Sequence, residues 1–139
     1  MAAQVIGAFF ASFCFSLPLR VPGKYLAHCG ITGAVGWLVY LLILESGFTG
    51  LMAAFFSAVV IALFSHVFAR VLKSPVTVFL VPGLLPLVPG ASIYRSVYYL
   101  IQNQGSLSSY YLSETLQIAG AIAVAVFLVD TLFRLVKKK

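Results

Sequence analysis

The sequence predicts an all-α integral membrane protein with about five membrane-embedded segments, and three observations lead to this fold class. First, 62% of the 139 residues are hydrophobic and only 9% are charged, whereas a soluble domain is about 45–50% apolar and about 25% charged. Second, apolar stretches near the length that crosses a bilayer recur along the chain. Third, basic residues stand at the ends of these stretches. We therefore expect a single transmembrane domain over residues 1–139.

The expected spans cover residues 2–19, 27–44, 49–69, 76–101 and 116–136. The first ends at Pro18, and Arg20 and Lys24 follow it instead of preceding it, which is the reverse of a secretory signal. We therefore expect a retained span. The second ends at Glu45, the third ends before Pro75, and the fourth is interrupted by proline and glycine.

A polar stretch, Gln102–Thr115, is expected to separate the fourth and fifth spans. Ser113 can cap the last helix, with Glu114 in its first turn. The last helix would run to the terminal lysines.

The charges predict the orientation. With the N-terminus outside, eight of the nine basic residues fall on the cytoplasmic side, as the positive-inside rule requires. Glu45 and Glu114 then fall outside. The prediction is an outside N-terminus and a cytoplasmic C-terminus. Arg95 is the exception among the basic residues, because it lies inside the fourth segment.

Small residues at four-residue spacing favour close helix packing. The stripes are Ala3, Gly7 and Ala11; Gly30 and Ala34; Ala54, Ala58 and Ala62; and Ala119 and Ala123. They indicate a bundle or oligomer interface, although alanine and glycine are common in any membrane helix. Cys14 and Cys29 lack metal-ligand spacing and are interpreted as small packing residues.

The fourth segment carries a broken-helix motif. Its members are Pro82, Gly83, Pro86, Pro89 and Gly90. Each interior proline costs a helix about 3 kcal/mol, and unpaired backbone is tolerated at membrane depth only inside protein or beside water. We expect two half-helices joined by an unwound stretch, or a re-entrant turn.

The start of the second half-helix is the candidate substrate site. A helix N-terminus attracts anions, and the candidate residues are Gly90, Ser92, Tyr94 and Arg95. An arginine at membrane depth is costly and can hold a carboxylate through two hydrogen bonds. Two alternatives stay open for Arg95: pairing with an acid of a partner chain, or reaching to the interface. Tyr94 and its neighbouring tyrosines could equally form an aromatic belt.

Other polar residues give weaker signals. Asp130 and Arg134 are spaced for an ion pair on one helix face, and a proton-coupling role for Asp130 is the alternative. His28 and His66 are interpreted as satisfied or interfacial histidines. The sequence contains no enzyme signature, no metal-ligand cluster and no cofactor motif, and its basic residues do not form the patch that nucleic acid requires.

The run PGLLPLVPGASIYRSVYYL over residues 82–100 resembles the signature segment of the threonine/serine exporter (ThrE) family, specifically its small C-terminal, YjjB-like module. Arg20-Val-Pro22 and the run GAVGWLVYLL over residues 33–42 are similar to that module's first loop and second span. The resemblance implies a bacterial inner-membrane location and export of small carboxylate-bearing metabolites, either threonine and serine or dicarboxylates such as succinate. It also implies a larger, YjjP-like membrane subunit as the partner.

The expected function is therefore the small subunit of a membrane exporter, with the broken segment in the translocation path. Two alternatives remain. One is a non-transporting scaffold that stabilises a larger partner, and the other is a homo-oligomeric channel.

Overall fold

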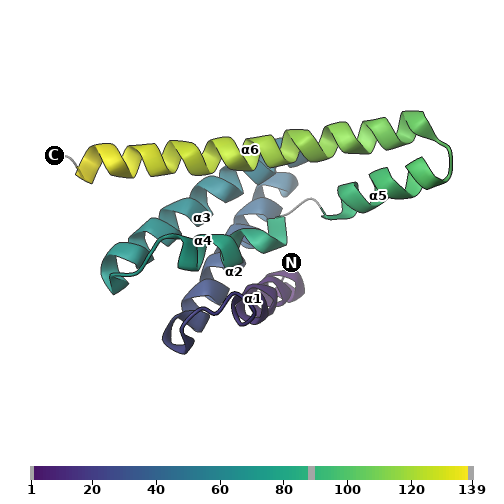
Figure 1. The fold of residues 1–139 in the computed structure, drawn as a ribbon. Coiled ribbons are helices and arrows are strands. Elements are labelled where there is room, and N and C mark those ends of the chain that lie inside the picture. The colour runs from purple at the N-terminus through teal and green to yellow at the C-terminus, as the bar shows by residue number, and fades with distance from the viewer. Residues whose placement is uncertain (1, 88–89, 138–139) are drawn as a thin grey trace.

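The computed structural model describes residues 2–87 and 90–137, and within them every regular element is a helix. The order is α1 (Ala2–Ser16), the 3-10 turn η1 (Gly23–Tyr25), α2 (Leu26–Glu45), α3 (Gly50–Leu72), α4 (Thr77–Leu84), the 3-10 turn η2 (Leu85–Leu87), α5 (Gly90–Ile101) and α6 (Gly105–Lys137). Figure 1 shows α5 antiparallel to the first half of α6, to one side of the group formed by α1 to α4. The second half of α6 packs on α3.

Three helices are long and apolar enough to cross a membrane, and a fourth span results if the bent pair around residues 88–89 is counted as one. The apolar helix α1 has 15 residues, which at 1.5 Å per residue is about 22 Å and shorter than a typical hydrocarbon core of about 30 Å. The all-helical class is confirmed. The count of five spans and the orientation stay predictions.

The interior is made mostly of small residues, while many large apolar residues face outward. The fully buried positions of α3 include Ala58, Ala62 and Ser65, whereas Phe10 and Phe127 are more than half exposed. A soluble protein has the opposite arrangement. Small side chains let helix backbones approach closely in lipid, so this pattern supports membrane embedding independently of hydropathy.

The predicted stripe Ala54, Ala58 and Ala62 is buried as expected. In α1, however, the buried stripe is Ala8, Ser12 and Ser16, and Gly7 has open space beside it. Serine is small enough for a close helix crossing, as glycine and alanine are. The prediction considered only glycine and alanine, so it missed Ser12 and Ser16. In α6, Ala119 and Ala123 are exposed, and Ala125 and Val129 are the buried pair.

Helices α1 and α2 approach each other closely at Gly33. A Cβ atom at Gly33 would overlap the Ser12 hydroxyl and lie 2.7 Å from the Ser12 Cβ. Ser12 is completely buried, so it has no room to move aside. A Cβ atom at Gly36 would likewise overlap the Ile61 side chain of α3. Helix α2 is therefore packed between α1 and α3 through its glycines.

The stretch after α5 differs from the prediction. Asn103, with φ of 61°, ends α5 in the left-handed conformation, and the Gln104 amide donates back to the Tyr99 carbonyl over 2.8 Å. Helix α6 then begins at Gly105, eight residues before Ser113, so the predicted cap at Ser113 is wrong. Residues 106–115 contain neither proline nor glycine, and polarity alone does not end a helix.

Serines join α5 to α6. The Ser96 hydroxyl donates to the Ser108 carbonyl (3.1 Å), and the Ser108 hydroxyl donates to the Ser96 carbonyl (2.8 Å). Tyr99 stacks on Tyr111 with ring centroids 5.6 Å apart. Ser92, Ser96 and Ser108 of this hairpin are thus buried, whereas most of its large apolar residues are exposed.

The crossing at Gly33 can be tested with a matched pair of substitutions. We expect Gly33→Val to destabilise the bundle by about 1–3 kcal/mol, the usual cost of overpacking a filled site. Gly7→Val adds the same side chain to open space and serves as the control. Thermal unfolding of the purified variants in detergent measures both. Equal melting temperatures for the two variants would contradict the close α1–α2 crossing.

Candidate functional site

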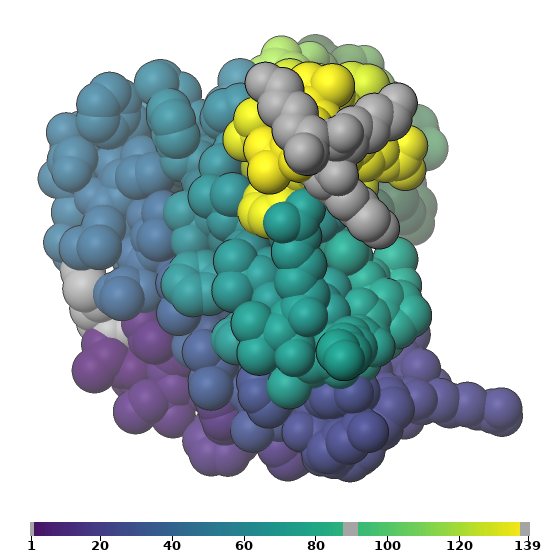
Figure 2. Space-filling model, turned by 90° about the vertical axis from the view of Figure 1, so that its left-hand side faces the viewer, coloured from purple at the N-terminus to yellow at the C-terminus, as the bar shows by residue number. Residues whose placement is uncertain are grey.

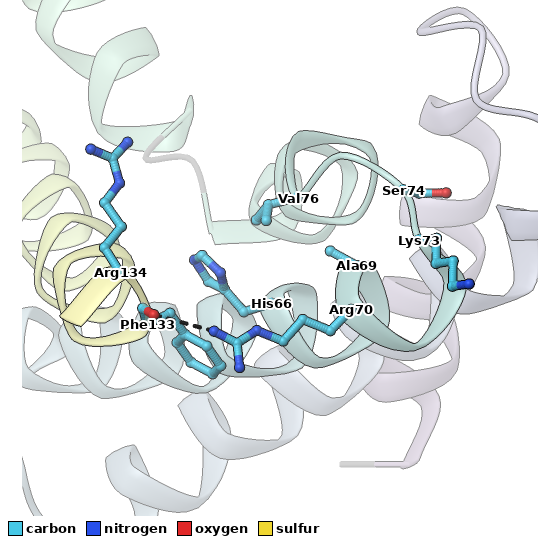
Figure 3. Close-up of a pocket in the computed structure, with 8 residues that line it drawn as sticks. All are labelled: His66, Ala69, Arg70, Lys73, Ser74, Val76, Phe133 and Arg134. Atoms are coloured by element: carbon cyan, nitrogen blue, oxygen red, sulfur yellow. Dashed lines mark hydrogen bonds between the residues drawn. The ribbon is translucent and has the colours of Figure 1, made fainter. Parts of the chain in front are cut away.

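Helix α3, the turn between α3 and α4, and helix α6 surround a cavity of about 410 Å³. It is lined by His66, Ala69, Arg70, Lys73, Ser74, Val76, Phe133 and Arg134. Figure 3 shows His66 and Arg70 extending from α3 toward α6, with Val76 on the opposite wall. Four of the eight lining residues carry basic side chains, so we name this space the basic pocket.

The basic pocket opens at one end of the molecule, and Figure 2 looks onto that end, where the tip of α6 lies above α3 and α4. The Tyr25 hydroxyl donates to the Leu72 carbonyl over 3.4 Å, which brings the start of α2 to the end of α3. Arg70 donates to the Phe133 carbonyl over 3.2 Å and lies 4.7 Å from the centre of the Phe133 ring. Three of the basic residues for which the positive-inside rule predicts a cytoplasmic location, Arg70, Lys73 and Arg134, therefore line one pocket.

In the part of the chain that the structure describes, Asp130 is the acidic group of this region. Its Oδ2 atom lies 3.0 Å from Arg134 Nε, and its Oδ1 atom lies 3.7 Å from His66 Nε2. The contact with Arg134 is the ion pair between residues four apart that the sequence predicts on one helix face. The contact with His66 joins α6 to α3, and the His66 ring also stacks on Phe133 at 4.5 Å and 10°.

A second cavity, of about 560 Å³, lies between α4 and α6 and has mostly apolar walls. It shares His66 and Val76 with the basic pocket, and Asp130 is its other titratable group. Leu80, Leu84 and the small residues Ala119 and Ala123 form much of the remainder. The exposed alanines of α6 therefore leave space for this cavity instead of forming a tight helix crossing.

The broken fourth segment contains two helical pieces. Helix α4 continues through Pro82 into η2, and the axis of α5 is bent by 51° from it. Helix α5 begins at Gly90, where the sequence predicts the second half-helix to start. Pro89 lies outside the described residues.

Pro82 carries no N–H, so it cannot donate to the carbonyl of Val78, four residues before it. The Cys29 thiol of α2 donates to that carbonyl over 3.2 Å and is completely buried. A neighbouring helix thus satisfies the backbone group that the proline leaves free. Cys29 is more than the packing residue that the sequence indicates, because this partnership depends on a contact between residues 49 positions apart.

Gly83 allows α4 to approach α2 and α3. A Cβ atom there would lie 2.8 Å from Thr32 Cγ2 and 3.1 Å from Ile61 Cγ2. The proline and the following glycine therefore have separate roles: Pro82 breaks the hydrogen-bond ladder, and Gly83 permits the close contact beside the break.

The candidate substrate residues lie apart from the basic pocket. Ser92 is buried, while Tyr94 is 68% exposed and Arg95 is exposed with its guanidinium 5.6 Å from the centre of the Tyr111 ring. Within the described residues, no carboxylate lies within ion-pair distance of Arg95. Arg95 lines neither of the two cavities above. The structure thus brings together His66, Asp130 and Arg134, and it leaves Arg95 on the α5–α6 hairpin.

The cluster of His66, Asp130 and Arg134 has only a weak signal in the sequence. The sequence pairs Asp130 with Arg134 and not with His66, because His66 and Asp130 are 64 positions apart and no motif links them. The usable signal was that both are ionisable residues inside apolar runs, where such groups are costly unless they have a partner.

These features define a polytopic helical membrane protein with a broken helix and a charged cluster at the end of its bundle. The model of the family described as "Threonine/Serine exporter, ThrE" matches residues 4–132. The chain therefore belongs to the threonine/serine exporter family, a family of membrane exporters, and the resemblance found in the sequence is confirmed.

A similar protein is an uncharacterised protein of Haemophilus influenzae, 32% identical over 89 residues. That match covers 63% of this chain and 30% of the relative, so the matched part of the chain spans less than a third of the relative's length. No solved structure matches the chain.

The role of Cys29 can be tested by comparing two substitutions. We expect Cys29→Ser to keep stability close to that of the unaltered chain, because serine retains a donor for the Val78 carbonyl. Cys29→Val fills the space without a donor and is expected to cost about 0.5–1.5 kcal/mol. Chemical unfolding in detergent micelles measures both.

A Pro82→Ala background provides the control, because alanine restores the backbone donor. The cost of Cys29→Val should shrink in that background. An unchanged cost would show that the thiol acts through packing alone.

Proposed function

We propose that this chain is the small subunit of an exporter for small carboxylate-bearing metabolites in the bacterial cytoplasmic membrane. The observation that carries the proposal is the family match over residues 4–132 in a chain with a broken, glycine- and proline-containing fourth segment. Substrates of the threonine and serine type or dicarboxylates such as succinate fit this class. The N-terminus outside and the C-terminus in the cytoplasm are part of the proposal.

A larger, YjjP-like membrane subunit is the proposed partner. The support for this partner is the resemblance of the run over residues 82–100 to the small module of the family. The hairpin of α5 and α6 presents exposed Tyr94, Val97 and Leu100 on its outer side, beside Arg95.

Arg95 and the start of α5 are proposed to meet the substrate carboxylate at the boundary with this larger subunit. The helix start at Gly90 and the exposed guanidinium are near each other in the chain, and Tyr111 supports the guanidinium from α6. An arginine can hold a carboxylate through two parallel hydrogen bonds. Arg95 has no acid partner among the described residues, so its charge is available for such a contact.

Efflux from proteoliposomes tests this proposal. The vesicles are loaded with labelled threonine, serine or succinate and contain this chain alone, the chain with the large subunit, or the pair with Arg95→Gln. We expect efflux from the pair, none from the chain alone, and a loss of at least about tenfold with Arg95→Gln, the loss expected for a charge-assisted contact. Lys24→Gln removes a basic residue elsewhere and should leave efflux unchanged.

Three results would contradict parts of the proposal. Normal efflux with Arg95→Gln would remove Arg95 from the path. Efflux from the chain alone would favour the homo-oligomeric channel. A parallel loss of large-subunit abundance and efflux with Arg95→Gln would favour the scaffold.

A further inference from the structure

We propose that the basic pocket is the loading site for the carboxylate of the exported solute, and that Asp130 competes with this carboxylate for Arg134. The inference rests on the proposed function and assigns its substrate a second site, distinct from Arg95. Four observations carry it: the charge of the pocket, the state of Arg134, the looseness of its ion pair and the adjoining cavity.

The charge of the pocket is strongly unbalanced. Arg70, Lys73 and Arg134 line it together with His66, and among the described residues Asp130 is the acid that contacts two of these groups, His66 and Arg134. Low-dielectric walls concentrate the field of such a cluster and raise the local concentration of anions. The volume of about 410 Å³ lies within the range of small-molecule sites.

Arg134 already holds a carboxylate in this structure. Its Nε atom lies 3.0 Å from Asp130 Oδ2, which is the distance and chemistry of a carboxylate ligand. A free carboxylate of similar shape can take the same place. The second guanidinium, of Arg70, is anchored on Phe133 from the opposite helix, so the two arginines approach the pocket from α6 and α3.

The pair between Asp130 and Arg134 is loose enough to exchange. The Arg134 side chain is 78% exposed and that of Asp130 is 38% exposed, and ion pairs of this kind contribute little stability. An incoming carboxylate therefore displaces Asp130 at small cost. The released Asp130 keeps its contact with His66, whose side chain is only 10% exposed.

The apolar cavity continues from the basic pocket. His66 and Val76 line both spaces, and Asp130 lines the apolar one. A solute held at Arg134 would thus lie next to a space of about 560 Å³ along α4 and α6. Helix α4 belongs to the broken segment, so the loading site adjoins the segment that we place in the translocation path.

The test measures binding to the full chain in nanodiscs of zwitterionic lipid, with labelled succinate and threonine as probes. We expect Arg134→Gln to weaken binding by about tenfold, the loss expected for one charge-assisted contact. Asp130→Asn should strengthen binding, because it removes the competing charge and keeps the side-chain shape. Lys24→Gln, a basic residue outside the pocket, should leave binding within about twofold of the unaltered chain.

The opposite signs for Asp130→Asn and Arg134→Gln are the decisive result, since general damage to the fold weakens binding in both. Weaker or unchanged binding with Asp130→Asn would overturn the proposed competition. Absence of solute binding in zwitterionic discs, with saturable binding of an anionic phospholipid that Arg134→Gln removes, would assign the pocket to a lipid headgroup and overturn the proposal.

The efflux assay separates this proposal from the exporter function. Efflux by the pair without any effect of Arg134→Gln on binding or transport would overturn the loading site and leave the exporter standing. Solute binding that follows the expected signs, without efflux from the pair, would overturn the exporter proposal and leave the pocket as a carboxylate site.

Discussion

Close approach between helix backbones is the constraint on which the rest of this structure depends. In lipid, burying an apolar side chain against another helix offers little gain over leaving it in the hydrocarbon, so helices associate through fitted contacts and hydrogen bonds. In this chain, Gly33 and Gly36 bring α2 against α1 and α3, and the Ser57 hydroxyl donates to the Gly36 carbonyl at the second crossing. The charged cluster is held at one end of the bundle because α3 and α6 pack along one another.

The break in the fourth segment shows how the same constraint accommodates proline. Pro82 removes one donor from α4, and a thiol from α2 takes its place at the Val78 carbonyl. Helix α4 therefore continues through Pro82, because a neighbouring helix satisfies the carbonyl that the proline leaves free. Beyond it, the chain turns by 51° and forms a hairpin with α6, joined by reciprocal serine bonds.

The sequence was sufficient for the helical class, for the position of the break and for the boundaries of α2 and α3 within a few residues, because these follow from local composition and from proline and glycine. It was insufficient for features that depend on contacts between residues far apart in the sequence. Ser113 was expected to start a helix, yet the preceding polar residues are helical since they pair with α5. The contacts of His66 with Asp130 and of Cys29 with Val78 join different helices, and no spacing along one chain reveals them. Arg95 was recognised as unusual, but its position away from the two cavities depends on the packing of α5 against α6.

Helix α6 is continuous over 33 residues, about 50 Å at the usual rise per residue, which exceeds the thickness of a hydrocarbon core of about 30 Å. A rod of this length adjusts to a bilayer by tilting. Its first half carries the α5 hairpin with Arg95, and its second half carries Asp130 and Arg134. Any change of tilt displaces these two regions in opposite directions about the middle of the rod, so the two ends of the protein are mechanically coupled without any change in the helix itself.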